Sequence, residues 1–189
     1  MGRYEMNGKG ERQKYGRLAL RSARDIAQIA VFVALVIGAQ LAFSAIPGVE
    51  VVTVLFVAFS FTFGVGKGAF AATAFTLLRN FLFGLFPTVL VLYLIYYNAL
   101  ACVFGLLGRA HLKGGWKTLF FVTITACVCT AAFTLLDDII TPLFFTFDKG
   151  AWRAYFYASL PIMFSQIVCT AITVGALFAP LKKVFSMVK

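Results

Sequence analysis

Charged side chains are scarce in this sequence. Asp, Glu, Lys and Arg make up only 13% of the 189 residues, whereas a soluble domain has about a quarter. Hydrophobic residues make up 61% and recur in long runs with short polar breaks between them. A helix needs about 20 such residues to cross the hydrocarbon core of a bilayer. The composition therefore argues against a soluble globular domain and predicts an integral membrane protein.

Six apolar runs predict six transmembrane helices. They cover residues 26–44, 49–64, 68–86, 89–107, 116–136 and 152–181. The last run is longer than one crossing needs. Pro161 divides it, so we expect 152–160 to lie near the outer surface or to begin a kinked helix. The runs lack the alternation of barrel strands. The expected fold is an all-α six-helix membrane bundle over residues 26–189, preceded by a basic tail over residues 1–25.

Acidic residues number only 7 against 17 Lys and Arg, which gives a net charge of +10. Most basic residues lie before the first run, in the second and fourth connections, or at the end of the chain. An even number of crossings places all of these on one side. Because cytoplasmic loops carry the Lys and Arg excess, both termini are predicted to face the cytoplasm of a bacterial cell. The spread of these charges over short loops argues against nucleic-acid binding.

Cysteine and histidine are also rare. The four cysteines, Cys102, Cys127, Cys129 and Cys169, all fall within predicted spans, and their spacing fits no zinc or redox motif. We interpret them as packing residues. The only histidine, His111, falls in a cytoplasmic connection. A histidine-based metal cluster or catalytic triad within the membrane is thereby excluded, and we expect neither a metal nor a cofactor.

The chain lacks a nucleotide-binding motif. The nearest text, GVGKGAF at 64–70, has the wrong glycine spacing and no Ser or Thr after Lys67. ATP hydrolysis by a P-loop is therefore excluded. The two halves show no repeat of the kind that many secondary carriers have. The text AFSA at 42–45 resembles a signal-peptide cleavage region, but the preceding apolar run is long for a signal peptide, so we expect it to stay uncleaved.

Arg79 stands inside the apolar run TLLRNFLFGLF. A charge at the centre of a membrane helix costs about 2.5–3.5 kcal/mol on insertion scales, so this side chain must reach protein or water. One interpretation is that the guanidinium extends to the outer surface. The other is that it lines an outward-facing cavity and offers its donors to a ligand, with Glu50 or Asp137 as its counter-ion.

Other polar side chains fall toward the outer ends of the same runs. Simple alternatives are an aromatic belt for the tyrosines and a solvated helix end for the two aspartates. Together, however, they predict a pocket that is open to the outside and aromatic, with a few polar groups. The candidate substrate-binding residues are Gln40, Glu50, Arg79, Asn80, Tyr93, Tyr96, Tyr97, Asn98, Asp137 and Asp138.

Ala30 and Ala34 form a small-residue face on the first run. Such a face serves either packing within the bundle or docking on another membrane subunit. With six spans, this length and the basic tail, the chain resembles the S component of an energy-coupling factor (ECF) vitamin transporter. The stretches AIPGVEVVTVLFVAFSFTFG and GKGAFAATAFTLLRNFLFG resemble a branch that includes cobalamin-specific S components.

The resemblance implies a division of labour. The S component captures a vitamin, here cobalamin as the best guess, while a transmembrane coupling protein and two cytoplasmic ATPases supply the energy. The alanine face would dock on the coupling protein. Two alternatives stay open: a membrane-embedded enzyme that uses Asp137 and Asp138, and a stand-alone channel or secondary carrier. Since no nucleophile or metal-ligand set accompanies the aspartates, we expect no enzymatic activity.

Overall fold

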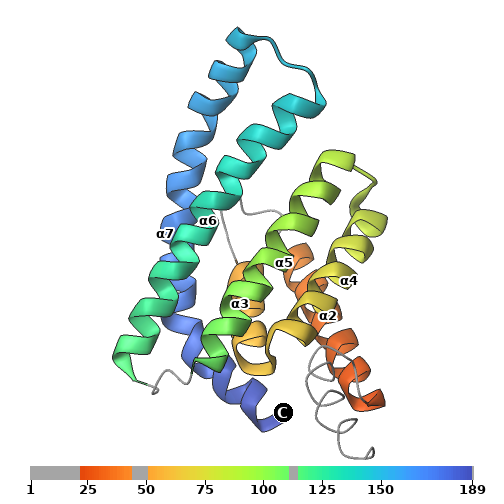
Figure 1. The fold of residues 1–189 in the computed structure, drawn as a ribbon, viewed down its shortest axis with the longest axis vertical. Coiled ribbons are helices and arrows are strands. Elements are labelled where there is room, and N and C mark those ends of the chain that lie inside the picture. Colours follow the sequence, from red (N-terminus) through yellow and green to blue (C-terminus); the bar gives the residue numbers. More distant parts are fainter. Residues whose placement is uncertain (1–21, 44–50, 111–114, 189) are drawn as a thin grey trace, which may run out of the picture.

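A computed structural model describes residues 22–43, 51–110 and 115–188. Within these ranges every element is helical (Figure 1). The helices are α2 (Ala23–Phe43), α3 (Val51–Phe63), α4 (Val65–Phe83), α5 (Pro87–Arg109), α6 (Trp116–Phe144) and α7 (Lys149–Val188). Four of them, α2, α5, α6 and α7, are long and apolar enough to cross a membrane. The all-helical prediction is confirmed, and the described helices are consistent with a helical membrane protein.

Successive helices run in opposite directions, so that α2, α4 and α6 point one way and α3, α5 and α7 the other (Figure 1). The most extensive packing joins α6 to α7 and α4 to α5, and α3 lies between these pairs against α5 and α7. Every residue of α3 from Val52 to Thr62 is buried. With 13 residues, α3 is about 20 Å long, which is shorter than the roughly 30 Å hydrocarbon core.

Glycines allow α5 to approach the turn between α3 and α4. A Cβ atom on Gly105 would lie 2.5 Å from the backbone nitrogen of Val65. A Cβ on Gly108 would overlap the carbonyl oxygen of Phe61. The turn itself passes through Gly64, whose φ of 87° is strained for residues with a side chain. The close packing of α5 against α3 and the start of α4 therefore depends on glycines, which have no Cβ atom.

One predicted boundary is wrong. Helix α6 continues to Phe144 instead of ending at residue 136, so Asp137 and Asp138 lie inside it. Of the two alternatives for 152–160, the structure agrees with the one in which this segment begins a helix: α7 runs from Lys149 through Pro161, and 152–160 is not a separate surface segment. Polar side chains of α6 accept hydrogen bonds from side chains of α7, which allows both helices to continue past these polar positions. Membrane helices also tolerate proline when neighbouring groups satisfy the backbone.

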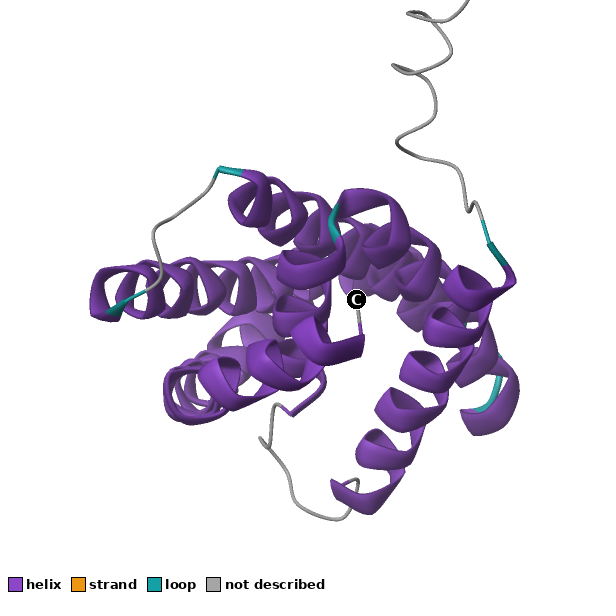
Figure 2. Ribbon diagram, turned by 90° about the horizontal axis from the view of Figure 1, so that it is seen from below, coloured by secondary structure: helices purple, strands orange, loops and turns teal. Residues whose placement is uncertain are grey.

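The start of α2 and the end of α7 lie at the same end of the bundle. Arg24 and Gln28 both donate hydrogen bonds to the carbonyl oxygen of Val188, at 3.0 and 2.8 Å. Figure 2 looks onto this end, with the last turn of α7 near the middle. The helix directions place most basic residues of the described chain here: Arg24, Lys67, Arg109, Lys117, Lys182 and Lys183. The opposite end holds Lys149 and Arg153 with the acidic Asp137, Asp138 and Asp148.

Candidate functional site

Tyr93, Tyr96 and Tyr97 of α5 face the interior of the bundle. Tyr96 and Tyr97 are buried, and Tyr93 is partly buried. The ring of Tyr97 lies 4.8 Å from that of Phe56 on α3, between ring centroids. Tyr93 and Tyr96 contact Phe133 on α6 at 5.8 and 4.6 Å. These rings therefore join α3, α5 and α6, and the interpretation as a lipid-facing aromatic belt is wrong for Tyr96 and Tyr97.

Arg79, near the end of α4, packs against aromatic rings. Its guanidinium carbon lies 4.4 Å from the ring centroid of Tyr93 and 5.5 Å from that of Phe83. These are cation–π contacts. Its Nε atom is buried without a hydrogen-bond partner among the described residues. Arg79 forms no ion pair with Asp137, whose carboxylate accepts bonds from Thr141 and Tyr155, and Glu50 lies outside the described residues.

The two asparagines lie between α4 and α5. Asn80 is 1% exposed, and its amide nitrogen donates to the carbonyl oxygen of Thr76 at 2.9 Å. Its Oδ1 is buried without a partner in the described chain. Asn98 bonds to Thr73 across the helix pair at 3.3 Å. A buried acceptor without a donor costs about 1–3 kcal/mol, so Asn80 marks a place where a donor from a ligand or water would be stabilising.

Gln40 occupies a separate place, on the last turns of α2. It is partly buried, and its Oε1 has no partner among the described residues. Helix α2 packs against α3 and α4 and makes no backbone contact with α6 or α7. The structure therefore does not bring Gln40 to the aspartates of α6.

Asp137 and Asp138 belong to a hydrogen-bonded cluster between α6 and α7. Asp137 accepts bonds from the hydroxyls of Thr141, at 2.7 Å, and Tyr155, at 2.8 Å. Asp138 is 3% exposed and accepts a bond from Ser159 at 2.8 Å, while its Oδ1 has no partner in the described chain. The interpretation of the pair as a solvated helix end is therefore wrong.

A cavity of about 150 Å³ opens beside this cluster. Its polar wall consists of Thr134, Asp137, Tyr155, Ser159 and Gln166, and Phe133 and Ile162 line the apolar side. Ligand pockets for drug-sized molecules run from about 300 to 1,000 Å³, so this cavity has room for one polar group of a larger ligand. Phe133 also contacts Tyr93, and the ring of Tyr93 contacts the guanidinium of Arg79. A continuous path of contacts thus leads from Arg79 to the cavity.

Sequence reasoning missed the α7 side of this cluster. Tyr155, Ser159 and Gln166 recur at helical spacing on one face of α7. On α6, the polar residues Thr134, Asp138 and Thr141 have the same spacing. Two helices joined by a turn of a few residues pack side by side, so matching polar faces on both sides of the turn were the available signal.

The small residues of α2 face outward. Ala30 and Ala34 are exposed, as are Ala27 and Gly38, and a Cβ atom on Gly38 would meet no atom within 4 Å. The buried face of α2 is formed by Ile29, Phe32, Val33 and Val36 instead. Ala30 and Ala34 therefore do not serve packing within the described bundle, and this alternative is wrong.

Comparison with family models, with curated proteins and with solved structures finds no match to the chain. A function is therefore inferred from the residues and their geometry.

Replacing Tyr155 by phenylalanine is expected to destabilise the α6–α7 pair. The change removes the hydroxyl that donates to Asp137, and loss of a hydrogen bond to a charged group costs about 1.5–3 kcal/mol. Thermal unfolding in detergent, followed by tryptophan fluorescence, measures the effect as a lowered midpoint. Tyr157→Phe is the control, because Tyr157 is 69% exposed. Equal midpoints for the two variants would contradict the Tyr155–Asp137 bond.

Proposed function

We propose that this chain is the substrate-capture (S) component of an ECF-type vitamin importer in the bacterial cell membrane, with cobalamin as the best guess for its substrate. The observation that carries the proposal is the path of inward-facing aromatic and polar side chains from Arg79 through Tyr93 and Phe133 to the Asp137 cavity. Such a mixture of aromatic walls and a few polar groups is typical of small-molecule sites. The ligand would enter from the end opposite the basic residues.

The exposed face of α2 supports the same proposal. Ala30 and Ala34 stand on the outside of the bundle, and small residues let a second membrane helix approach closely. Because the chain has no P-loop, the energy for import would come from partners. These would be a transmembrane coupling protein, docked on the alanine face, and two cytoplasmic ATPases.

A ligand that stays bound through purification tests the proposal. The chain is purified in mild detergent, and its native mass spectrum is searched for a retained small molecule. Cobalamin, flavins, folates, pantothenate and lipoate are then tested for binding by calorimetry. Tight binding of one vitamin supports the capture function. Failure of all of them to bind would contradict it, and uptake by the chain alone in liposomes would indicate a carrier instead.

Arg79→Ala is expected to weaken binding of the retained vitamin by about tenfold or more. A hydrogen bond to a charged group contributes about 1.5–3 kcal/mol, and a tenfold change in affinity is about 1.4 kcal/mol. Calorimetric titration measures the change. Arg153→Ala is the matched control, because Arg153 is an exposed cation at the same end of the bundle. Parental affinity in Arg79→Ala would show that Arg79 only packs against Tyr93.

A further inference from the structure

An apolar groove separates α2 from the last turns of α7. The backbones of the two helices make no close approach to each other; side chains of α2 reach the carbonyl oxygen of Val188 on α7, and Phe59 and Phe63 of α3 form the floor. The groove has a volume of about 330 Å³. Its walls include Ala27, Val31, Leu35, Phe59, Val184 and Phe185. Val31, Leu35 and Val184 are all at least half exposed, so the groove is open along its side to the surroundings of the bundle.

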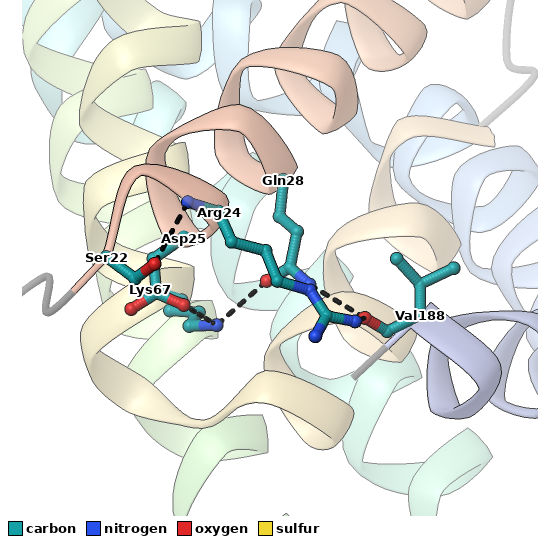
Figure 3. Close-up of polar contacts among 6 residues, drawn as sticks. All are labelled: Ser22, Arg24, Asp25, Gln28, Lys67 and Val188. Atoms are coloured by element: carbon teal, nitrogen blue, oxygen red, sulfur yellow. Dashed lines mark hydrogen bonds and ion pairs between the residues drawn. The ribbon is translucent and has the colours of Figure 1, made fainter.

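Arg24 places a positive charge at the mouth of the groove and forms no ion pair with a described residue; Figure 3 shows the polar contacts around it. Lys67 forms an ion pair with Asp25, 2.6 Å between Nζ and Oδ1, and also donates to Gln28 at 2.8 Å. Arg24 is exposed and donates from Nη2 to the carbonyl oxygen of Val188 at 3.0 Å. A guanidinium has five N–H donors, and of the guanidinium nitrogens of Arg24 only Nη2 bonds to another described residue.

We propose that the groove binds one anionic phospholipid, with its phosphate on Arg24 and one acyl chain along Val31 and Leu35. The groove follows α2 from residue 24 to residue 35, a rise of about 16 Å at 1.5 Å per residue. Half of a hydrocarbon core of roughly 30 Å is about the same length. A cationic mouth on an apolar channel of this length matches an amphiphile with a negative head.

Small residues let a second membrane helix approach closely, and on α2 these are Ala30 and Ala34, which lie outside the walls of the groove. The coupling protein proposed above would use the neighbouring alanine face of α2. The lipid site rests on the proposed membrane insertion with the basic end at the cytoplasmic surface, where anionic lipids are abundant. It does not rest on vitamin capture, and its test is independent of that function.

The headgroup contact is tested with dioleoyl phosphatidylglycerol and dioleoyl phosphatidylcholine. Each is added to the delipidated, purified protein, and bound lipid is counted by native mass spectrometry. We expect one phosphatidylglycerol to bind about tenfold more tightly than phosphatidylcholine, and Arg24→Gln to abolish this preference. Lys117→Gln, which removes an exposed cation from the same end, should leave it unchanged. A wild-type protein without a preference, or an Arg24→Gln protein that keeps it, would overturn the proposal.

The acyl-chain contact is tested by filling the groove. Val31→Trp should lower binding of the same phosphatidylglycerol about tenfold, whereas Val128→Trp on α6 should not; the two valines are 69% and 63% exposed.

Two other occupants of the groove are tested directly. Excess inorganic phosphate should fail to displace the lipid, and displacement would assign the site to free phosphate. A wild-type dimer that Val31→Trp converts to a monomer without loss of lipid would assign the groove to a second copy of the chain. Either result would overturn the proposal.

Discussion

Gly108→Ala is expected to lower the thermal midpoint of the protein by roughly 2–12 °C. The new methyl group would overlap the carbonyl oxygen of Phe61, and a backbone atom cannot move away without separating α3 from α5. Overpacking of this kind costs about 1–3 kcal/mol or more, and each kcal/mol shifts the midpoint of a chain of this size by about 2–4 °C. Size-exclusion chromatography after heating in detergent measures the fraction that stays folded.

Gly175→Ala on α7 is the control for this prediction. A Cβ atom there would meet nothing within 4 Å, and alanine is favoured over glycine in a helix by roughly 0.5–1 kcal/mol. The midpoint should therefore stay the same or rise. Gly105→Ala, beside the nitrogen of Val65, should behave like Gly108→Ala. If Gly108→Ala and Gly175→Ala had equal midpoints, the close approach of α5 to α3 would be wrong.

If the proposed capture function holds, Ala34→Trp is expected to reduce vitamin uptake by at least about tenfold while ligand binding by the purified chain stays within about twofold of the parent. Ala34 is exposed on α2 and lies on the face opposite Phe32, Val33 and Val36. An indole there would clash with a docked helix, and a loss of about 1.4 kcal/mol in the association already gives a tenfold change. Uptake is measured in cells that also express the coupling protein and ATPases.

Val128→Trp provides the comparison for Ala34→Trp, since it adds the same bulk to an exposed position of α6. It should leave uptake and binding unchanged. Equal damage to uptake and to ligand binding by Ala34→Trp would show that Ala34 supports the bundle itself. Uptake at the parental level would place the coupling protein elsewhere.

The apolar runs were sufficient to place the helices, because desolvation of the backbone in lipid leaves helices as the main solution. The apolar runs gave a wrong helix end where polar side chains are hydrogen-bonded to a neighbouring helix. Hydropathy treats Asp137 and Asp138 as the end of a span, yet Tyr155 and Ser159 on α7 bond to them and α6 continues to Phe144. These hydrogen bonds form only when α6 and α7 pack together, so the hydropathy of either apolar run alone does not predict them.

The sequence also could not predict which side of each helix packs inside the bundle. The spacing of Tyr93, Tyr96 and Tyr97 places the three rings on one face of a helix, but helices that are apolar all around carry little amphipathic signal. Whether this face met lipid or protein was therefore open until the contacts with Phe56 and Phe133 were known. The same ambiguity concerned Ala30 and Ala34, whose exposure depends on which other residues of α2 fill the core.

The length of α7 has a practical consequence for experiments in living cells. Its 40 residues extend about 60 Å, while a bilayer with its headgroups is about 40–45 Å thick. The last part of α7 bends away from the rest of the helix (Figure 1), so its end-to-end reach is less than this length. With the basic end at one surface, we expect the turn at 145–148 to lie at the opposite surface. If the basic end faces the cytoplasm as proposed, an antibody should stain an epitope tag inserted in this turn on intact cells, and absence of staining would contradict this orientation.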